Sequence, residues 1–177
     1  MISIIGGKLK GRKLNSIKIN SVRPTQAKIR KSIMDIIYDF ENKTVLDLYS
    51  GFGTLGIECL SRGAKSVDFI EKDYKVIKIL RQNVEYLGLH THCNIFKSCV
   101  FDFLNKSNSK YDIIFADPPY ETCDFTMILS KVKNKLNLGG VFCFESNKLD
   151  SVIDESVRVK IYGDTQITFW ENKIWKK

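Results

Sequence analysis

A short run that follows an apolar stretch carries the residues best suited to chemistry. Residues 111–121 read YDIIFADPPYE, and residues 113–116 have the branched, apolar character of a strand buried on both faces. A proline ends such a strand because it cannot donate to a sheet ladder. One proline would be enough for that, whereas this strand ends in Asp117, Pro118, Pro119 and Tyr120. Because two prolines stiffen the backbone, we interpret these four residues as a site.

These four residues suit an exocyclic amino group on a flat base. The Asp117 carboxylate and the Pro118 carbonyl can accept the two N–H bonds of an amine and draw electron density toward its nitrogen. Tyr120 can stack on the ring, a contact worth ~1–3 kcal/mol per base in nucleic-acid sites, and Pro119 holds the tyrosine in place. A base inside a helix cannot enter such a pocket, so we expect a target that is flipped out or already unpaired.

A glycine-rich loop after an earlier strand is the second candidate site. Residues 47–56 read DLYSGFGTLG, in which Gly51, Gly53 and Gly56 match G-x-G-x-x-G, and Glu71 lies twenty residues beyond Gly51. Glycines let backbone N–H groups approach a ligand, and an acid at the end of the next strand can accept bonds from ribose hydroxyls. The pattern predicts a nucleoside ligand.

Asp47 indicates which nucleoside is bound. It stands four residues before Gly51, where a carboxylate would repel the pyrophosphate of a dinucleotide. The same carboxylate favours the cationic sulfonium and the amino group of S-adenosyl-L-methionine. A dehydrogenase would also need a second, substrate-binding domain, and a chain of 177 residues is too short for two such domains. We therefore expect S-adenosyl-L-methionine as the cofactor.

The elements that must position these two sites alternate along the chain after residue 43. Alternation of strands and helices predicts a Rossmann-like α/β fold, with a mostly parallel sheet covered by helices on both faces. In such sheets ligands lie beyond the carboxyl ends of the strands. A polar loop is expected within 101–110, and an antiparallel strand pair within 156–171. The patterns predict strands at 44–49, 66–71, 93–98, 111–116 and 139–146, and helices at 54–63, 74–88 and 125–136.

The N-terminal segment carries the whole net charge of +8. The first 31 residues contain nine cations and no acid, whereas the rest of the chain has 19 cations against all 20 acids. Such a segment attracts phosphates without reading sequence, and the alternative is a solvated face that keeps the protein soluble. Residues 2–14 read as a hairpin. A helix with an isoleucine stripe follows from a Thr25 cap, with Arg30 and Lys31 outside that stripe.

Composition excludes several classes of protein. The chain is 44% hydrophobic and 27% charged, ordinary values for a globular protein. No apolar run approaches the ~20 residues of a membrane span, and we expect no signal peptide. We therefore expect a cytoplasmic protein with one main domain. Its five cysteines form no C-x-x-C pair, and we expect no metal site.

The motifs VLDLYSGFGTLGIECLSRGA, IEKD and ADPPY, in this order, resemble the class I S-adenosylmethionine-dependent methyltransferases that act on exocyclic amino groups. The opening IIGGKLKGRKL and VRPTQAKIRKSIMDII narrow the resemblance to the bacterial RsmD family, which methylates a guanine-N2 of 16S ribosomal RNA in the small ribosomal subunit or its assembly intermediate. The resemblance covers nearly the whole chain. It implies an RNA-binding hairpin and helix over residues 1–41, packed on a methyltransferase domain over 42–177. We expect a monomer.

The resemblance also implies roles for particular residues. Cys99 departs from the family pattern, because many relatives carry an acid there that reads the adenine amino group of the cofactor. Backbone groups near Cys99 and Val100, or the Asp102 side chain, would take that role. Many members of the wider class carry asparagine at Asp117, and an aspartate can accept both bonds of an amine at least as well. The implied cofactor contacts are Asp47, Ser50, Gly51, Gly53, Thr54, Glu71, Cys99, Val100 and Asp117, with residues 117–120 at the target base.

Three other functions remain open. An adenine-N6 DNA methyltransferase would usually need a sequence-reading domain, and only the N-terminal segment could supply one. A non-catalytic RNA-binding module would not need an intact glycine loop or DPPY motif. A dinucleotide oxidoreductase conflicts with Asp47. For the rRNA methyltransferase, the expected phosphate contacts are Lys8, Lys10, Arg12, Lys13, Arg23 and Arg30.

Overall fold

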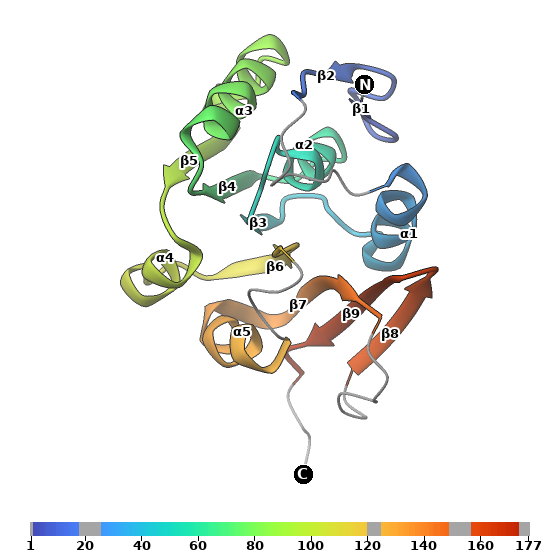
Figure 1. Ribbon diagram of the computed structural model, residues 1–177, viewed down its shortest axis with the longest axis vertical. Coiled ribbons are helices and arrows are strands. Elements are labelled where there is room, and N and C mark those ends of the chain that lie inside the picture. The colour runs from blue at the N-terminus through green and yellow to red at the C-terminus, as the bar shows by residue number, and fades with distance from the viewer. Residues whose placement is uncertain (1, 18–25, 120–124, 149–156, 174–177) are drawn as a thin grey trace.

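A seven-stranded sheet forms the centre of the computed structural model, which describes residues 2–17, 26–119, 125–148 and 157–173 (Figure 1). The strand order is β5-β4-β3-β6-β7-β9-β8. Neighbouring strands from β5 to β7 are parallel, and β9 is antiparallel to both β7 and β8. The bounds are β3 Thr44–Leu48, β4 Ser66–Glu71, β5 Cys93–Lys97, β6 Tyr111–Ala116, β7 Leu136–Asn147, β8 Val157–Tyr162 and β9 Thr165–Glu171. The predicted mostly parallel sheet with an antiparallel C-terminal pair is confirmed.

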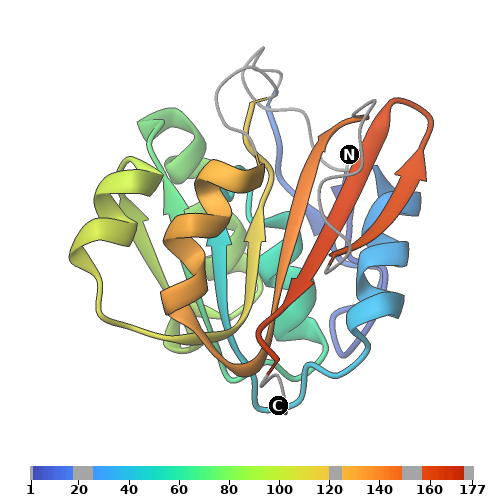
Figure 2. The ribbon, with the colours of Figure 1, turned by 90° about the horizontal axis from the view of Figure 1, so that it is seen from below.

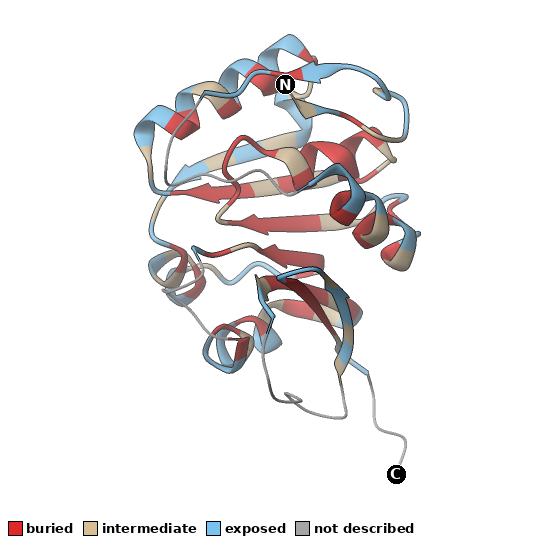
Figure 3. Cartoon of the chain, turned by 45° about the vertical axis from the view of Figure 1, so that its right-hand side comes forward, coloured by how far each residue is buried: buried red, intermediate tan, exposed pale blue. Residues whose placement is uncertain are grey.

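Helices cover both faces of this sheet, as the alternating pattern predicts (Figure 2). On one face, α1, α2 and α3 bury an apolar cluster that includes Ile33, Ile57 and Leu80, and on the other face α4 and α5 bury Leu104 and Ile128. Figure 3 shows the buried residues gathered between the helices and the strands. The bounds are α1 Ala27–Ile37, α2 Thr54–Ser61, α3 Tyr74–Tyr86, α4 Val100–Lys106 and α5 Phe125–Val132, with 3-10 turns η1 His90–His92 and η2 Lys133–Lys135.

The N-terminal segment contains the predicted hairpin, in which β1 (Ile2–Ser3) pairs antiparallel with β2 (Lys13–Leu14). Ile4 and Leu14 are buried in the same cluster as α1 and α2, so the hairpin shares the core of the main domain. Helix α1 begins after Gln26, and the expected Thr25 cap lies outside the described residues. The domain boundary at residue 42 stays a prediction.

Two segments differ from the sequence prediction. The polar loop expected within 101–110 lies at 107–110, and the residues before it, for which no element was predicted, form helix α4. Val100 and Leu104 lie one helical turn apart and are buried, but one apolar pair is too short a signal to establish a helical period. Strand β7 begins at Leu136, three residues before the predicted start, because the preceding helix gives way to η2 after Val132.

Within the described ranges, no helix is long and apolar enough to cross a membrane. The same residues contain no group of three or more histidine, cysteine and acidic side chains that could hold a metal ion. Cys59 and Cys143 are buried free thiols, whereas the Cys99 thiol is exposed.

Candidate active site

Three strands end side by side at the edge of the sheet where the two predicted sites lie. In the parallel register, Leu48 of β3 lies opposite both Ile70 of β4 and Ala116 of β6. The glycine loop follows Leu48, Glu71 follows Ile70, and Asp117 follows Ala116. The structure therefore brings the glycine loop and the start of the DPPY motif to one carboxyl edge, where ligands of such sheets bind.

The glycine loop is a left-handed turn between β3 and α2. Tyr49, Gly51 and Gly53 have φ angles of +56°, +54° and +83°. Gly53 is the N-cap of α2, which begins at Thr54, and a Cβ at Gly53 would collide with the Leu80 side chain. A bulky residue with positive φ, such as Tyr49, is strained, and backbone strain concentrates at functional sites.

Asp47 lies beneath this loop and is buried. Its Oδ2 accepts a hydrogen bond from the Gly56 backbone N–H at 2.9 Å, which ties β3 to the first turn of α2. Burial raises the pKa of Asp47 to about 8; the Gly56 N–H opposes this shift and the nearby Glu71 adds to it. The carboxyl group is therefore largely protonated at neutral pH, and a cation placed nearby would favour its ionised form.

Glu71 connects the end of β4 to the glycine loop. Its Oε2 accepts from the Gly51 N–H at 3.0 Å, and its Oε1 accepts from the N–H groups of Lys72 and Asp73 at 2.8 and 2.9 Å. Three backbone donors fix the orientation of this carboxylate, which has about four acceptor positions in all. The predicted ribose contact of Glu71 would use the remaining one.

Ser50 has an unusual environment for a hydroxyl group. Its Oγ is buried and has no hydrogen-bond partner among the residues that the structure describes. Buried polar atoms are nearly always paired, so an orphaned hydroxyl at the start of a ligand-type loop is a position at which a bound polar group can supply the missing bond.

The Cys99 position lies at the same edge, after β5. The Ser98 N–H donates to the Glu71 carbonyl, and Cys99 is the N-cap of α4, with an exposed side chain. Val100 is buried in the first turn, while Asp102 is exposed. The structure thus places Cys99 and Val100 beside the strand end that carries Glu71.

Asp117 and Pro118 form the described part of the DPPY motif together with Pro119. Asp117 is half-buried, Pro118 is buried and Pro119 is exposed, whereas Tyr120 lies outside the described residues. Glu145, which the sequence analysis missed, is buried on β7 one residue after Phe144, the register partner of Ala116. Burial raises the pKa of the Cys143 thiol, and the nearby charges of Glu145 and Asp117 raise it further.

Asn83 is a second residue that the sequence analysis missed. It is fully buried on α3, where its Nδ2 donates to the carbonyls of Phe52 and Asn15, both at 3.1 Å, and its Oδ1 accepts from the Asn15 N–H at 2.7 Å. Asn83 therefore links the chain after the hairpin to the glycine loop. The sequence does contain a signal for this residue, because Asn83 is polar and lies on the apolar face of a predicted helix.

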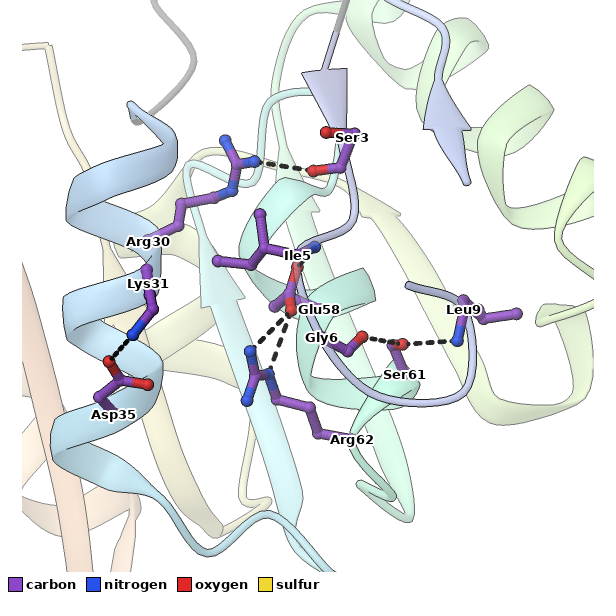
Figure 4. Close-up of polar contacts among 10 residues, drawn as sticks. All are labelled: Ser3, Ile5, Gly6, Leu9, Arg30, Lys31, Asp35, Glu58, Ser61 and Arg62. Carbon is purple, nitrogen blue, oxygen red and sulfur yellow. Dashed lines mark hydrogen bonds and ion pairs between the residues drawn. The ribbon is translucent and has the colours of Figure 1, made fainter. Parts of the chain in front are cut away.

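The hairpin is fastened to α2 by two buried side chains (Figure 4). Glu58 Oε2 accepts from the Ile5 N–H at 2.9 Å, while its Oε1 pairs with Arg62 at 3.1 Å. Ser61 Oγ accepts from the Leu9 N–H at 2.9 Å, and the Ser61 carbonyl accepts from Lys8 N–H at 2.6 Å. Because Ser61 ends α2, the hairpin turn lies one helix length, ~12 Å for eight residues, from the glycine loop.

Most of the predicted phosphate contacts are placed on the surface of this hairpin. Lys8, Lys10, Arg12 and Lys13 are exposed, and Arg23 lies outside the described residues. The expectation of an exposed Arg30 is wrong.

Arg30 is only 3% exposed, and its Nη2 donates to the Ser3 carbonyl at 2.9 Å (Figure 4). Burial lowers the pKa of Arg30, whereas the charge of Glu58 raises it. This side chain joins α1 to the hairpin and is not available to phosphates.

Solved structures define the class of protein to which this fold belongs. The Escherichia coli protein yhhF, described as a methyltransferase, matches with a TM-score of 0.86 at 25% identity, over 97% of this chain and 98% of that chain. An RNA methyltransferase from Salinibacter ruber, in complex with S-adenosyl-L-homocysteine, matches with a TM-score of 0.67 at 17% identity, over 88% and 98%. The fold is that of the class I methyltransferases, as predicted.

Sequence comparison then gives the family. The model described as "Conserved hypothetical protein 95" matches residues 2–171. Ribosomal RNA small subunit methyltransferase D of Buchnera aphidicola subsp. Acyrthosiphon pisum is 33% identical over 156 residues, which cover 86% of this chain and 81% of that protein. The chain belongs to this family, the RsmD family that its motifs resemble.

Proposed function

We propose that this protein transfers a methyl group from S-adenosyl-L-methionine to the exocyclic N2 amine of a guanine in 16S ribosomal RNA. It acts as a monomer in the cytoplasm, on the small ribosomal subunit or its assembly intermediate. The observation that carries the proposal is the pairing of β3 with β6, which sets the glycine loop beside Asp117 and Pro118. The name of the Buchnera relative, a small-subunit rRNA methyltransferase, supports the choice of substrate.

The residues around the glycine loop fit the proposed cofactor. The Ser50 hydroxyl, which has no partner among the described residues, can form one hydrogen bond with it, and the left-handed turn at Gly51 and Gly53 leads directly into the start of α2. When bound, S-adenosyl-L-methionine supplies a methyl group that its sulfonium already activates. We assign its binding to Asp47, Ser50, Gly51, Gly53, Thr54, Glu71, Cys99, Val100 and Asp117.

Asp47 responds to the positive charge of the cofactor. In the ligand-free protein burial holds the pKa of this carboxyl group at about 8, so it carries a proton at neutral pH. A cationic ligand lowers that pKa, and Asp47 then releases its proton and provides a negative charge within the core. The Gly56 N–H at 2.9 Å stabilises the ionised form.

Asp117 and Pro118 hold the base that is methylated. The Asp117 carboxylate and the Pro118 carbonyl accept the two N–H bonds of the guanine amine and aim its nitrogen in line with the methyl group. As the nitrogen takes the methyl group and the carbon–sulfur bond of the cofactor breaks, the nitrogen would gain positive charge, which Asp117 would stabilise through a charge-assisted hydrogen bond until one amine proton is released to solvent. Tyr120 stacks on the base, which must leave any helix to reach this edge.

The test uses purified protein, labelled S-adenosyl-L-methionine and small ribosomal subunits that lack their own guanine-N2 methylation. Free 16S RNA, duplex DNA and an Asp117→Ala variant serve as controls. Label in N2-methylguanosine, lost in the variant, is the expected result, and the ratio of subunit to free RNA identifies the preferred substrate. Label in DNA adenine, or no label in any substrate while the cofactor binds, would overturn the proposal.

A further inference from the structure

The outer face of α3 gathers cations that the composition of this part of the chain does not require. After residue 31 the chain holds 19 cations against 20 acids and is almost neutral. On α3, however, Lys75, Lys78 and Arg81 are exposed together, while the opposite side of the helix is buried against the sheet. Glu85 is exposed on the same face, and Asp73 is engaged as the N-cap, where Oδ1 accepts from the Lys75 N–H at 2.7 Å.

Two exposed tyrosines stand at the ends of this face, and each is paired with a cation. Tyr74, in the first turn, is 64% exposed, and the Lys97 ammonium lies 5.5 Å from its ring centroid. Tyr86, the last residue, is 57% exposed, and the Arg12 guanidinium lies 4.9 Å from its ring centroid. Exposed aromatic rings interleaved with cations are the surface on which nucleic-acid bases stack and phosphates bind.

The two ends of this face of α3 lie near two different parts of the molecule. Tyr74 follows Glu71 by three residues, at the edge of the sheet that carries the proposed reaction site, while Tyr86 touches Arg12 of the hairpin. Figures 1 and 3 show α3 running along the margin of the molecule beside the hairpin. Thirteen residues of helix span ~20 Å, the length of about six phosphates along one strand of a duplex.

We propose that the outer face of α3, from Tyr86 and Arg12 to Tyr74 and Lys97, is an RNA-binding surface that joins the hairpin to the reaction edge. The inference rests on the proposed function, because it takes the RNA to be the substrate of that reaction. The hairpin turn lies at the far end of α2 from the glycine loop, so an RNA held by both needs contacts between them. The face of α3 provides those contacts.

Charge provides the first test. The triple variant Lys75→Ala, Lys78→Ala, Arg81→Ala is compared with a matched variant that removes three exposed lysines elsewhere, Lys106, Lys110 and Lys160. Binding to the small subunit and to 16S RNA is measured across a range of salt concentrations. Three lost phosphate contacts should weaken binding at least tenfold and reduce the slope of log K against log salt by ~2–3, while cofactor affinity and melting temperature stay unchanged.

The tyrosines provide the second test. Tyr74→Ala and Tyr86→Ala should each weaken RNA binding about fivefold or more, as loss of one base stack does, whereas Tyr74→Phe and Tyr86→Phe should bind as the wild type does. Equal salt slopes for the triple variant and its matched control, together with unchanged binding by the alanine variants, would overturn the inference. A wild-type protein that binds the subunit but methylates nothing would instead contradict the proposed function. The RNA binding of the α3 variants and their controls could still be compared.

Discussion

The carboxyl edge of the sheet and the N-terminal hairpin differ in both charge and construction. At the edge, carboxylates come from four neighbouring strands, and those of Asp47 and Glu71 are buried and held by backbone N–H groups. On the hairpin the charges are cationic and exposed, while its backbone is held by Glu58 and Ser61 of α2. At the edge the charged groups themselves are held in place. On the hairpin only the backbone is held, and the cationic side chains are exposed.

From this difference we infer that the edge determines the rate of methyl transfer and that the hairpin contributes affinity for RNA. The phosphates of RNA are repelled by an acidic edge, which suits a neutral base and a cationic cofactor, and they are attracted by the exposed cations of the hairpin. Changes at the edge should therefore reduce the rate of methyl transfer far more than the affinity for RNA. Changes on the hairpin should reduce the affinity for RNA far more than the rate of methyl transfer.

Asp117→Ala should have the largest effect. Without the carboxylate, the positive charge that develops on the amine loses its acceptor, and the rate of methyl transfer should fall about 1000-fold, or ~4 kcal/mol. Single-turnover transfer to small subunits, at saturating concentrations of cofactor and RNA, measures the loss. Asp117→Asn keeps an acceptor oxygen and should retain most of the rate; an equal loss in both variants would show that the carboxyl oxygen does not act as described.

Glu58→Ala should have the next largest effect, on stability. It removes the acceptor of the Ile5 N–H, and it removes the negative charge that lies near Arg62 and the buried Arg30. The free energy of unfolding should therefore fall by ~3 kcal/mol. Urea denaturation measures the change. Glu58→Gln keeps one acceptor and should cost less; a fully stable alanine variant would mean that the hairpin does not depend on this residue.

Asp47 should make stability depend on pH. Because its pKa is about 8 in the folded protein and near 3.8 when unfolded, the folded state holds a proton that the unfolded state has lost between these values. The free energy of unfolding should therefore fall by ~2 kcal/mol as pH rises from 6 to 8. Asp47→Asn should remove this fall, and identical pH profiles for the two proteins would contradict the protonated state.

Replacement of Lys8, Lys10, Arg12 and Lys13 by alanine should have the smallest effect. These exposed cations contribute long-range attraction, so their loss should reduce the salt slope of RNA binding by ~3 and weaken binding about tenfold at physiological salt. Methyl transfer at saturating RNA should not change. An unchanged salt slope would remove the hairpin from the RNA-binding surface.

The sequence predicted the elements around the site better than the partners of individual side chains. Strand β6 and the glycine loop were predictable because an apolar run and a glycine pattern are local signals. Arg30 was not, because its burial depends on Glu58 and Ser3, which are distant in sequence. Local spacing does place Arg30 one turn before the buried Met34, a signal that the isoleucine stripe obscured.

Glu145 and Asn83 were missed for a similar reason. Each is a polar residue within an apolar strand or helix face, and sequence alone does not show what it contacts. Asn83 is explained only by its bonds to Asn15 and Phe52, which come together in the folded chain. Polar residues on apolar faces are therefore the positions at which the structure adds most to the sequence.

If the end of β6 holds one exocyclic amine, methyl transfer must distinguish guanosine from inosine. Inosine lacks only the N2 amine of guanine and keeps the rest of its hydrogen-bonding edge. Once the labelled nucleotide has been mapped, small subunits are reconstituted with guanosine or inosine at that position, and single-turnover methyl transfer is measured for both. Transfer to guanosine with none to inosine is the predicted result, whereas equal transfer to inosine would show that the reaction takes place at another atom.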